Sequence, residues 1–537
     1  MTIADGRLQI ADQLRIAGLL IAISACSTQP TAPPAATPAK PFIDVVELSA
    51  IDARDRMAKG ELTSEALTAA YLKRITEVDD GGPMLGAVIE VNPRAEDEAR
   101  ARDEERTAGK VRGPLHGIPI LIKDNVDVVG MVNSAGSLAL AEHRPKADAF
   151  MVTRLREAGA VILGKTNLSE WANFRSTRST SGWSSRGGQT KNPYVLSRNP
   201  CGSSSGTGAA IAASLGAIGV GTETDGSIIC PASVNGLVGL KPTVGLVSRT
   251  GIIPISISQD TAGPMSRTVA DAALLLSAMA GVDQADPAGA AAEGKIAADY
   301  TTFLKPDAVK GKRFGVLRQV MAFHPDVDAA VANAITALKG AGAEVVDVKV
   351  STYNDWNDAE FSVLLYEFKD GLNAYLKKSG APHTSLEALI AFNKANADRV
   401  MPIFGQEIFE QAQAKGSLSD AAYIKARDSA LRLAGRDGLV ATLTREKLDA
   451  IIAPSMSPAW PTDHVLGDHF IGAGYGMAAV ARTPSITVPI GATRDLPLGL
   501  TFMGPAYSEG ELIGFGYALE QVLKARKAPG FKPTLSP

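Results

Sequence analysis

Two glycine-rich segments that each hold a serine lie one helix and one strand apart in this chain. Ser203 lies in CGSSSGTGAA, and Ser227 lies in GTETDGSIICPA. Between the two serines, residues 208–215 have a helical pattern and residues 217–222 have the pattern of a buried strand. A helix followed by a strand brings the chain back to the edge of a sheet from which it started. We therefore expect the two serine segments to meet as loops in the folded protein.

A lysine upstream of both serines indicates that the serines take part in catalysis. Lys123 ends the apolar run of GPLHGIPILIKDN. A serine hydroxyl is a poor nucleophile until a base takes its proton, and a buried lysine can be that base if burial lowers its pKa. Glycines around the serines let backbone N–H groups approach a substrate oxygen, because no Cβ intervenes. Lys123, Ser203 and Ser227 together indicate a serine hydrolase that uses no histidine.

Three competing motifs are weaker. GAVILGKT at 159–166 fits a phosphate-binding loop, but its middle residues have the pattern of a buried strand, which commits the amides that a phosphate needs. GSSSG, centred on Ser204, fits the nucleophile elbow of α/β-hydrolases, but a proline- and asparagine-containing loop precedes it instead of a strand. DHVLGDH at 463–469 is the one candidate metal cluster, and a solvated loop is favoured there. We expect no metal and no cofactor.

The segments around Lys123, Ser203 and Ser227 resemble the amidase signature family in their order and spacing. The resemblance extends from 64–75 through GKTNLSEWANF to GLKPTVGLVSRTGIIPISISQDTAGPMSRTVADAALLL. It implies that Lys123 is the base, that Ser203 is a bridging serine with a cis peptide bond, and that Ser227 is the nucleophile. The reaction it implies is hydrolysis of a carboxamide to a carboxylate and ammonia or an amine, through an acyl-enzyme.

One departure from the common family pattern narrows the resemblance. Asp225 stands before Gly226 where most members have a second glycine. This variant, together with CGSSSG and ISQDTAGP, is similar to the bacterial peptide amidase branch, which implies C-terminally amidated peptides as substrates. We expect the backbone N–H groups of Thr224, Asp225, Gly226 and Ser227 to hold the oxyanion. Two alternatives stay open, which are the glutaminase subunit of a tRNA-dependent amidotransferase and a fatty or aryl amide hydrolase.

Composition and pattern predict one large α/β domain over 42–537. The chain has 537 residues, of which 45% are hydrophobic, so it can bury a substantial core. By the resemblance, the domain is layered, with a mixed central sheet covered by helices. Residues 353–448 are mostly helical in pattern and are expected to shape the substrate channel. The net charge is −3 without a basic stripe, which argues against nucleic acid as a partner.

Alternating patterns place the individual elements. Thr63 can cap a helix whose apolar residues recur at 3.6-residue spacing from Leu67 to Val78. Further helices are expected at 148–158, 208–215 and 327–339. Strands are expected at 118–122, 160–163, 217–222, 312–317, 344–350, 451–454, 485–489 and 499–503.

The N-terminus predicts export. Residues 16–23 form an apolar run that leads into Ile23-Ser24-Ala25-Cys26, and this tetrad resembles a bacterial lipobox. We expect a lipoprotein-type signal peptide over 1–25, a lipid on Cys26, and a proline- and alanine-rich tether over 26–41. The enzyme would then lie on the periplasmic face of a bacterial membrane, with the outer membrane favoured, and it would be cytoplasmic if this interpretation is wrong.

Two further cysteines stand close to the serines. Cys201 lies just before Ser203, and Cys230 lies just after Ser227, so the two thiols can be neighbours in space. An oxidising periplasm would permit a disulfide between them. Spacing does not fix geometry, and two buried free thiols are the favoured expectation. The natural substrate and the oligomeric state stay open.

Overall fold

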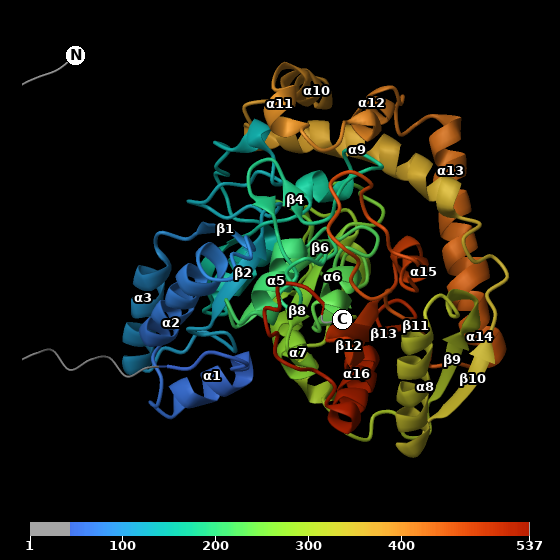
Figure 1. Cartoon of the computed structure of the whole chain (residues 1–537), viewed down its shortest axis with the longest axis horizontal. Coiled ribbons are helices and arrows are strands. Elements are labelled where there is room, and N and C mark those ends of the chain that lie inside the picture. The colour runs from blue at the N-terminus through green and yellow to red at the C-terminus, as the bar shows by residue number, and fades with distance from the viewer. Residues whose placement is uncertain (1–42, 536–537) are drawn as a thin grey trace, which may run out of the picture. The chain divides into compact units, whose positions relative to one another are not determined.

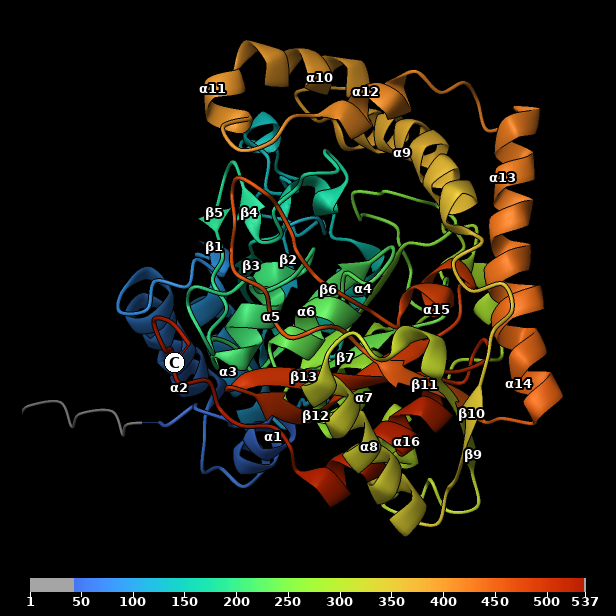
Figure 2. The ribbon, with the colours of Figure 1, turned by 45° about the vertical axis from the view of Figure 1, so that its right-hand side comes forward.

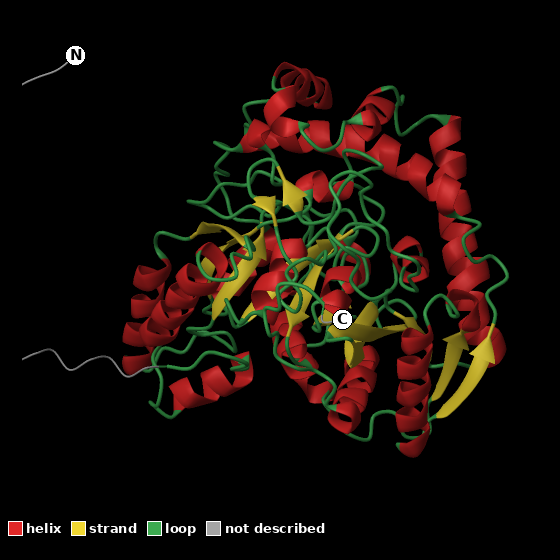
Figure 3. Cartoon of the chain, in the orientation of Figure 1, coloured by secondary structure: helices red, strands yellow, loops and turns green. Residues whose placement is uncertain are grey.

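A twisted sheet of eleven strands runs through the part of the chain that the computed structural model describes, residues 43–535 (Figures 1 and 3). The strand order is β1-β3-β2-β6-β8-β7-β12-β13-β11-β9-β10. The strands are β1 (Val88–Val91), β2 (Pro119–Lys123), β3 (Val161–Thr166), β6 (Ile218–Glu223), β7 (Val238–Lys241), β8 (Thr261–Ser266), β9 (Arg313–Leu317), β10 (Glu344–Val348), β11 (Ala450–Pro454), β12 (Ser485–Thr493) and β13 (Leu496–Met503). A separate two-stranded sheet joins β4 (Trp183–Ser184) and β5 (Gly188–Gln189).

Parallel and antiparallel pairs coexist in the large sheet. β2 runs parallel to β3 and β6, and β9 runs parallel to β10 and β11. β8 is antiparallel to β6 and β7, and β12 is antiparallel to β7 and β13. The sheet is therefore mixed, and the predicted α/β fold class is confirmed.

Helices lie on both sides of this sheet (Figure 2). The α-helices are α1 (Ala50–Ala58), α2 (Ser64–Arg74), α3 (Ala95–Thr107), α4 (Phe150–Glu157), α5 (Ser205–Ala212), α6 (Ile229–Val234), α7 (Val269–Met279), α8 (Pro325–Gly340), α9 (Asn357–Ser379), α10 (Leu386–Ala395), α11 (Ala397–Val400), α12 (Glu407–Gln413), α13 (Ala421–Leu431), α14 (Ala441–Glu446), α15 (Gly476–Val480) and α16 (Glu509–Leu523). Helices α9 to α14 occupy the segment 353–448, and in Figure 1 α9 to α13 run along the top and right of the ribbon.

Helix α2 shows why these elements begin where they do. The Thr63 side chain accepts a hydrogen bond from the N–H of Ala66 at 3.1 Å, which satisfies one of the otherwise unpaired amides of the first turn. Leu67 and Tyr71, one turn apart, are fully buried on the same face. The helix becomes a π-helical segment from Ile75 to Asp80.

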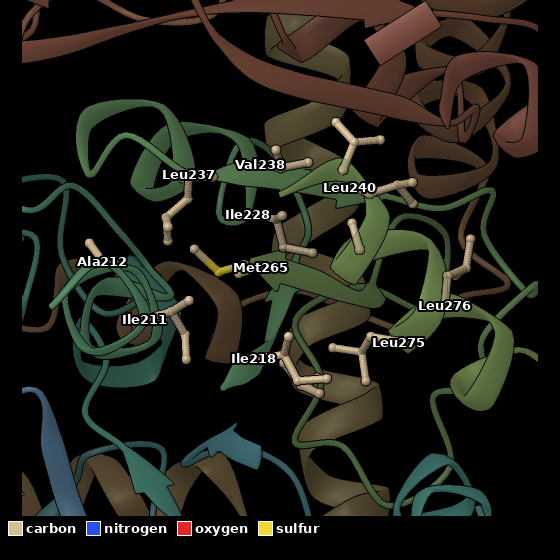
Figure 4. Packing of buried hydrophobic residues seen from close by; sticks show 14 of the residues in the cluster. Ile211, Ala212, Ile218, Ile228, Leu237, Val238, Leu240, Met265, Leu275 and Leu276 are labelled. Atoms are coloured by element: carbon tan, nitrogen blue, oxygen red, sulfur yellow. The ribbon is translucent and has the colours of Figure 1, made fainter. Parts of the chain in front are cut away.

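Apolar side chains from α5, β6, β8 and α7 pack together around the centre of the sheet (Figure 4). Ile211, Ile218, Met265 and Leu275 are all fully buried there. Burying such a side chain stabilises the fold by about 1.5–3 kcal/mol. This packing fixes helix α5 against β6, and these two elements are the ones that lie between the two serine segments.

Glycine permits the close approach of α5 to the neighbouring backbone. A Cβ on Gly206 would lie 2.3 Å from the carbonyl oxygen of Ala87 and 2.4 Å from that of Asn167. The Gly206 N–H instead donates to the Asn167 carbonyl at 3.0 Å. The helix begins at Ser205, three residues earlier than the pattern predicts, because it follows directly from the first serine loop.

The phosphate-loop motif at 159–166 is a strand. β3 covers Val161–Thr166, is buried throughout, and pairs with β1 and β2. The ammonium of Lys165 is buried, donates to the carbonyls of Val126 and Val132, and forms an ion pair of 3.1 Å with Asp124. Both the backbone and the lysine of this motif are therefore committed to the fold.

The predictions for the N-terminus lie outside the described residues. These predictions are the signal peptide at 1–25, the lipidated Cys26 and the tether at 26–41. Within residues 43–535, none of the helices is long and apolar enough to cross a membrane.

The expectation of two free thiols is wrong. Cys201 and Cys230 form a disulfide, with their Cα atoms 6.0 Å apart. The N–H of Ser204 donates to the carbonyl of Ser227 at 3.2 Å, so the two loops touch and bring the cysteines within bonding range. The expected meeting of the two loops is confirmed, but the spacing of the residues did not fix the distance between the two cysteines.

We predict that loss of this disulfide destabilises the protein without unfolding it. A crosslink between Cys201 and Cys230 lowers the entropy of the unfolded chain, and for a loop of this length that effect is about 3–4 kcal/mol. The double variant Cys201→Ala/Cys230→Ala should lose about this much free energy of unfolding in a guanidinium titration. Reductant should shift the wild-type midpoint and leave that of the double variant unchanged; an insensitive wild type would contradict the pairing.

Candidate active site

Lys123 is held at the end of a buried strand. It is the last residue of β2, whose five residues are all buried, and its side chain is inaccessible to solvent. Its Nζ lies 2.8 Å from Ser203 Oγ, 2.8 Å from Thr222 Oγ1 and 3.2 Å from the Thr222 carbonyl oxygen. Thr222 belongs to β6, the strand beside β2. Adjacent parallel strands thus deliver the lysine and one of its partners to the same edge of the sheet.

Burial sets the basicity of this lysine. Desolvation of the ammonium lowers the pKa of Lys123 from its ordinary 10.5 to about 7, while the negative charges of Asp260 and Glu223 act in the opposite direction. An amine with a pKa of about 7 is substantially neutral at physiological pH, and a neutral amine can accept a proton.

Ser203 lies on a backbone with the conformation that the family resemblance implies. The peptide bond between Gly202 and Ser203 is cis. The Ser203 carbonyl accepts a hydrogen bond from the N–H of Ser169 at 3.1 Å, and the serine is fully buried. A Cβ on Gly202 would lie 2.1 Å from the hydroxyl oxygen of Ser169, so a larger residue before Ser203 would displace that hydroxyl.

The position before Ser227 requires glycine, both for its backbone conformation and for the space left by its neighbours. Gly226 has a φ of 79°, and a Cβ there would lie 2.2 Å from the ring of Tyr475. The Glu223 carboxylate accepts hydrogen bonds from the N–H groups of Ile228 at 2.7 Å and Ile229 at 3.0 Å, which fixes the chain on the other side of the serine.

The proton relay requires one contact between Lys123 and Ser203 and another between Ser203 and Ser227, and the structure contains the first. Lys123 and Ser203 are within hydrogen-bonding distance. Ser227 Oγ has no hydrogen-bond partner among residues 43–535, and its loop touches the first serine loop through Ser204 instead. Ser227 is 8% exposed. Its hydroxyl therefore has no protein group to release before it reacts.

The loop from Thr224 to Ser227 offers unused hydrogen-bond donors. Within the described part of the chain, no protein group accepts a hydrogen bond from the backbone N–H groups of Thr224, Asp225, Gly226 or Ser227. Four consecutive free amides around a bend are a suitable cradle for a developing oxyanion.

Asp225 is the exposed member of this otherwise buried loop. Its carboxyl reaches accessible space, yet protein surrounds it closely enough that desolvation raises its pKa well above the ordinary value. The nearby carboxyl groups of Glu360 and Glu223 raise the pKa further. A raised pKa favours the neutral carboxyl over the carboxylate at any given pH, and so weakens its repulsion of negative charge in the loop.

A small cavity borders the two serine loops. Its volume is about 20 Å³, which is room for a small polar group such as a water molecule. Polar side chains line one part and the isoleucines of residues 252–255 line the rest; the lining includes Asn125, Ser203, Thr222, Glu223, Thr224, Ile252, Ile253, Ile255 and Asp260.

Sequence reasoning missed several members of this site. Thr222 contacts Lys123 directly, and Asn125 Nδ2 donates to Thr222 Oγ1 at 3.0 Å. Asp260 accepts a hydrogen bond from Thr224 Oγ1 at 2.6 Å. Thr222 could have been found as the polar end of the expected strand 217–222, which leads to the second serine segment. Asp260 stood in the ISQDTAGP stretch, which served only as a family resemblance.

No metal cluster accompanies these residues. Within residues 43–535, no three His, Cys, Asp or Glu side chains are arranged to hold a metal ion. DHVLGDH lies in a loop in which His469 is largely exposed. Asp468 in the same loop is bonded to the backbone and hydroxyl of Ser181.

The chain matches a known family over most of its length. The family model described as Amidase matches residues 66–513. A probable amidase of Arabidopsis thaliana is 40% identical over 500 residues, which is 91% of this chain and 92% of the relative. A glutamyl-tRNA(Gln) amidotransferase subunit of Roseiflexus castenholzii is 36% identical over 89% of this chain and 96% of its own length.

A solved structure matches both the fold and the sequence. The native peptide amidase of Stenotrophomonas maltophilia superposes with a TM-score of 0.88 at 54% identity, over 90% of this chain and 99% of that one. The range matched by the family model includes Lys123, Ser203 and Ser227. The chain therefore belongs to the amidase signature family and is an amide hydrolase.

Proposed function

We propose that this amidase hydrolyses the C-terminal amides of short peptides, with Lys123, Ser203 and Ser227 as its catalytic triad. The observation that carries the proposal is the contact of 2.8 Å between a fully buried lysine amine and the hydroxyl of a serine with a cis peptide bond. A base with a pKa of about 7 in contact with a serine hydroxyl can form the start of a proton relay, and we propose that Ser227 is the next group in it.

The relay begins at the neutral amine of Lys123. Three oxygen atoms surround Nζ, but a neutral amine has two N–H bonds, so Nζ can donate to the two Thr222 oxygens and accept from Ser203 Oγ. Ser203 passes its proton to Lys123 and takes one from Ser227, whose Oγ then forms a bond to the amide carbon. Ser227 has to turn toward Ser203 when substrate binds, and its unpaired hydroxyl leaves it free to do so.

Collapse of the tetrahedral intermediate reverses the proton flow. The free amides from Thr224 to Ser227 hold the oxyanion while the carbon–nitrogen bond breaks. The proton returns from Lys123 through Ser203 to the leaving nitrogen, which departs as ammonia and leaves an ester on Ser227. Water then gives a proton to the same relay and attacks the ester carbon. The bond to Ser227 Oγ breaks, the proton returns through Ser203 to that oxygen, and the product leaves as a carboxylic acid that ionises in solution, so the enzyme regains its starting protonation.

Similarity to a peptide amidase supports the choice of substrate. The identity of 54% to the Stenotrophomonas maltophilia enzyme exceeds the 36% to the amidotransferase relative. Helices α9, α10 and α12 pack in one apolar cluster with Ile253 and Ile255, which line the small cavity. We propose that the helical segment 353–448 walls the path of an extended peptide. The glutaminase and the fatty or aryl amide hydrolase are the competing functions.

We also propose that the N-terminal sequence directs the enzyme to a bacterial membrane. Residues 1–25 would be a lipoprotein-type signal, Cys26 the lipidated residue and 26–41 the tether, with the enzyme on the periplasmic face of a bacterial membrane. A disulfide between Cys201 and Cys230 is compatible with an oxidising compartment. Fractionation of cells should find wild type with membranes and Cys26→Ala in the soluble fraction; equal soluble fractions would contradict the anchor.

Activity should rise with pH through the titration of Lys123. The pKa of this group is lowered to about 7, and the neutral form is the base, so kcat/KM is expected to be low at pH 5 and to increase about tenfold per unit up to pH 7 before levelling off. The measurement is kcat/KM from pH 5 to pH 10 with one amide substrate. A curve that is flat or falls across pH 7 would rule out this base.

Substrate preference separates the candidate functions. Dipeptide or tripeptide amides should be hydrolysed with higher kcat/KM than oleamide, an anilide or free glutamine, while internal peptide bonds stay intact. Ammonia release from purified enzyme measures the comparison, with Ser227→Ala as the blank. An anilide, oleamide or glutamine that exceeds the peptide amides tenfold, which is about 1.4 kcal/mol of transition-state binding, would make the peptide assignment wrong.

A further inference from the structure

Residues 255–260 form a short loop that contacts two other parts of the site. One is the loop from Thr224 to Ser227, called the oxyanion loop below, and the other is helix α9. Strand β8 begins at Thr261, which pairs with Glu223, the last residue of the antiparallel strand β6. The residues that follow β6 and those that precede β8 therefore leave the sheet side by side. This places Asp260 directly against Thr224.

Asp260 holds both loops with one carboxylate. Its Oδ1 accepts from Thr224 Oγ1 at 2.6 Å, and its Oδ2 accepts from the N–H groups of Ile255 and Ser256, each at 2.8 Å. The first contact fixes the start of the oxyanion loop, and the other two close residues 255–260 on themselves. Asp260 also lines the small cavity together with Ser203.

Helix α9 fixes the far side of residues 255–260. Glu367, almost fully buried, accepts hydrogen bonds from Ser258 N at 2.9 Å, from Ser258 Oγ at 2.5 Å and from the hydroxyl of Ser256. Glu360, two helical turns earlier on the same helix face, accepts from Gln259 Nε2 at 2.8 Å. Helix α9 therefore fixes residues 255–260 on the side opposite to Thr224.

Asp260 is also one of two negative charges that face Lys123. The other is Glu223, whose carboxylate is engaged with the N–H groups of Ile228 and Ile229. The cation that faces Asp260 is Arg249, and this guanidinium is paired with Asp286. Burial raises the pKa of Asp260 to about 6, and its three hydrogen bonds oppose the rise, so the group is ionised where Lys123 is neutral.

We propose that Asp260 is a positioning residue of the amide hydrolysis, which fixes the oxyanion loop through Thr224 and presents the negative charge that Lys123 faces. The inference deepens the proposed function and rests on the role given there to Lys123. Removing the charge should weaken the lysine as a base, because an opposite charge nearby favours the protonated amine. Removing only the Thr224 contact should disturb the loop and leave the lysine unchanged.

Three variants separate these effects. Asp260→Asn removes the charge and keeps the size, Thr224→Val removes one hydroxyl and leaves the charge, and Glu367→Gln alters the support of the same loop without facing Lys123. Each is compared with wild type in kcat, KM and the pH at which kcat/KM is half-maximal, with the amide that the enzyme hydrolyses fastest. Thermal unfolding and near-ultraviolet circular dichroism establish that each variant is folded.

For Asp260→Asn we expect kcat to fall about tenfold or more with KM within about threefold, and the half-maximal pH to move to lower values. Thr224→Val should lower kcat with the half-maximal pH unmoved, and this variant decides the positioning role if Asp260→Asn does not fold. Glu367→Gln should leave the half-maximal pH at its wild-type value.

Two results would overturn the inference. One is a wild-type kcat in Asp260→Asn or Thr224→Val. Catalysis would then not depend on the hydrogen bond between these two residues. The other is a lowered kcat in Asp260→Asn with the half-maximal pH unmoved, as in Glu367→Gln, which is the signature of structural support alone. The role of Asp260 is tested by comparing the variants with wild type, whereas the proposed function is tested by the substrate preference of wild type alone. The two can therefore fail separately.

Discussion

The burial of Lys123 is the interaction on which the rest of the site depends. A charged ammonium in the interior is costly, and the protein meets that cost by lowering the pKa of the group to about 7 and by surrounding Nζ with three oxygen atoms. Two of these oxygens belong to Thr222 and the third to Ser203. The lysine can stay in this place only while strand β6 and the first serine loop stay beside β2.

The sheet brings these groups together from segments far apart in the chain. The ends of β2 and β6 and the start of β8 meet at one edge, which gathers Lys123, Thr222 and Asp260. Glycines then allow the backbone to pass where side chains would collide, at Gly202 against Ser169 and at Gly226 against Tyr475. Local glycine chemistry and long-range strand order are therefore both needed to form the site.

Much of this arrangement could be predicted from the sequence, because its signals are local. The helix and strand between the two serines, and the buried strand that ends in Lys123, are each contained in a few consecutive residues. What could not be predicted depends on contacts between distant segments. The disulfide between Cys201 and Cys230 requires Cα atoms 6.0 Å apart, which the expected meeting of the two loops does not specify. The support of residues 255–260 by Glu360 and Glu367 requires a helix that lies about a hundred residues further along the chain.

The central claim is that Ser227 is the nucleophile and that Lys123 activates it through Ser203. Its most direct test is covalent labelling with a fluorophosphonate, followed by mass spectrometry of the intact protein and of its peptides. A single adduct on Ser227 is predicted, formed much more slowly in Lys123→Met and absent from Ser227→Ala. An adduct on Ser203 or Ser204 in the wild type, or a label that persists in Ser227→Ala, would contradict the assignment.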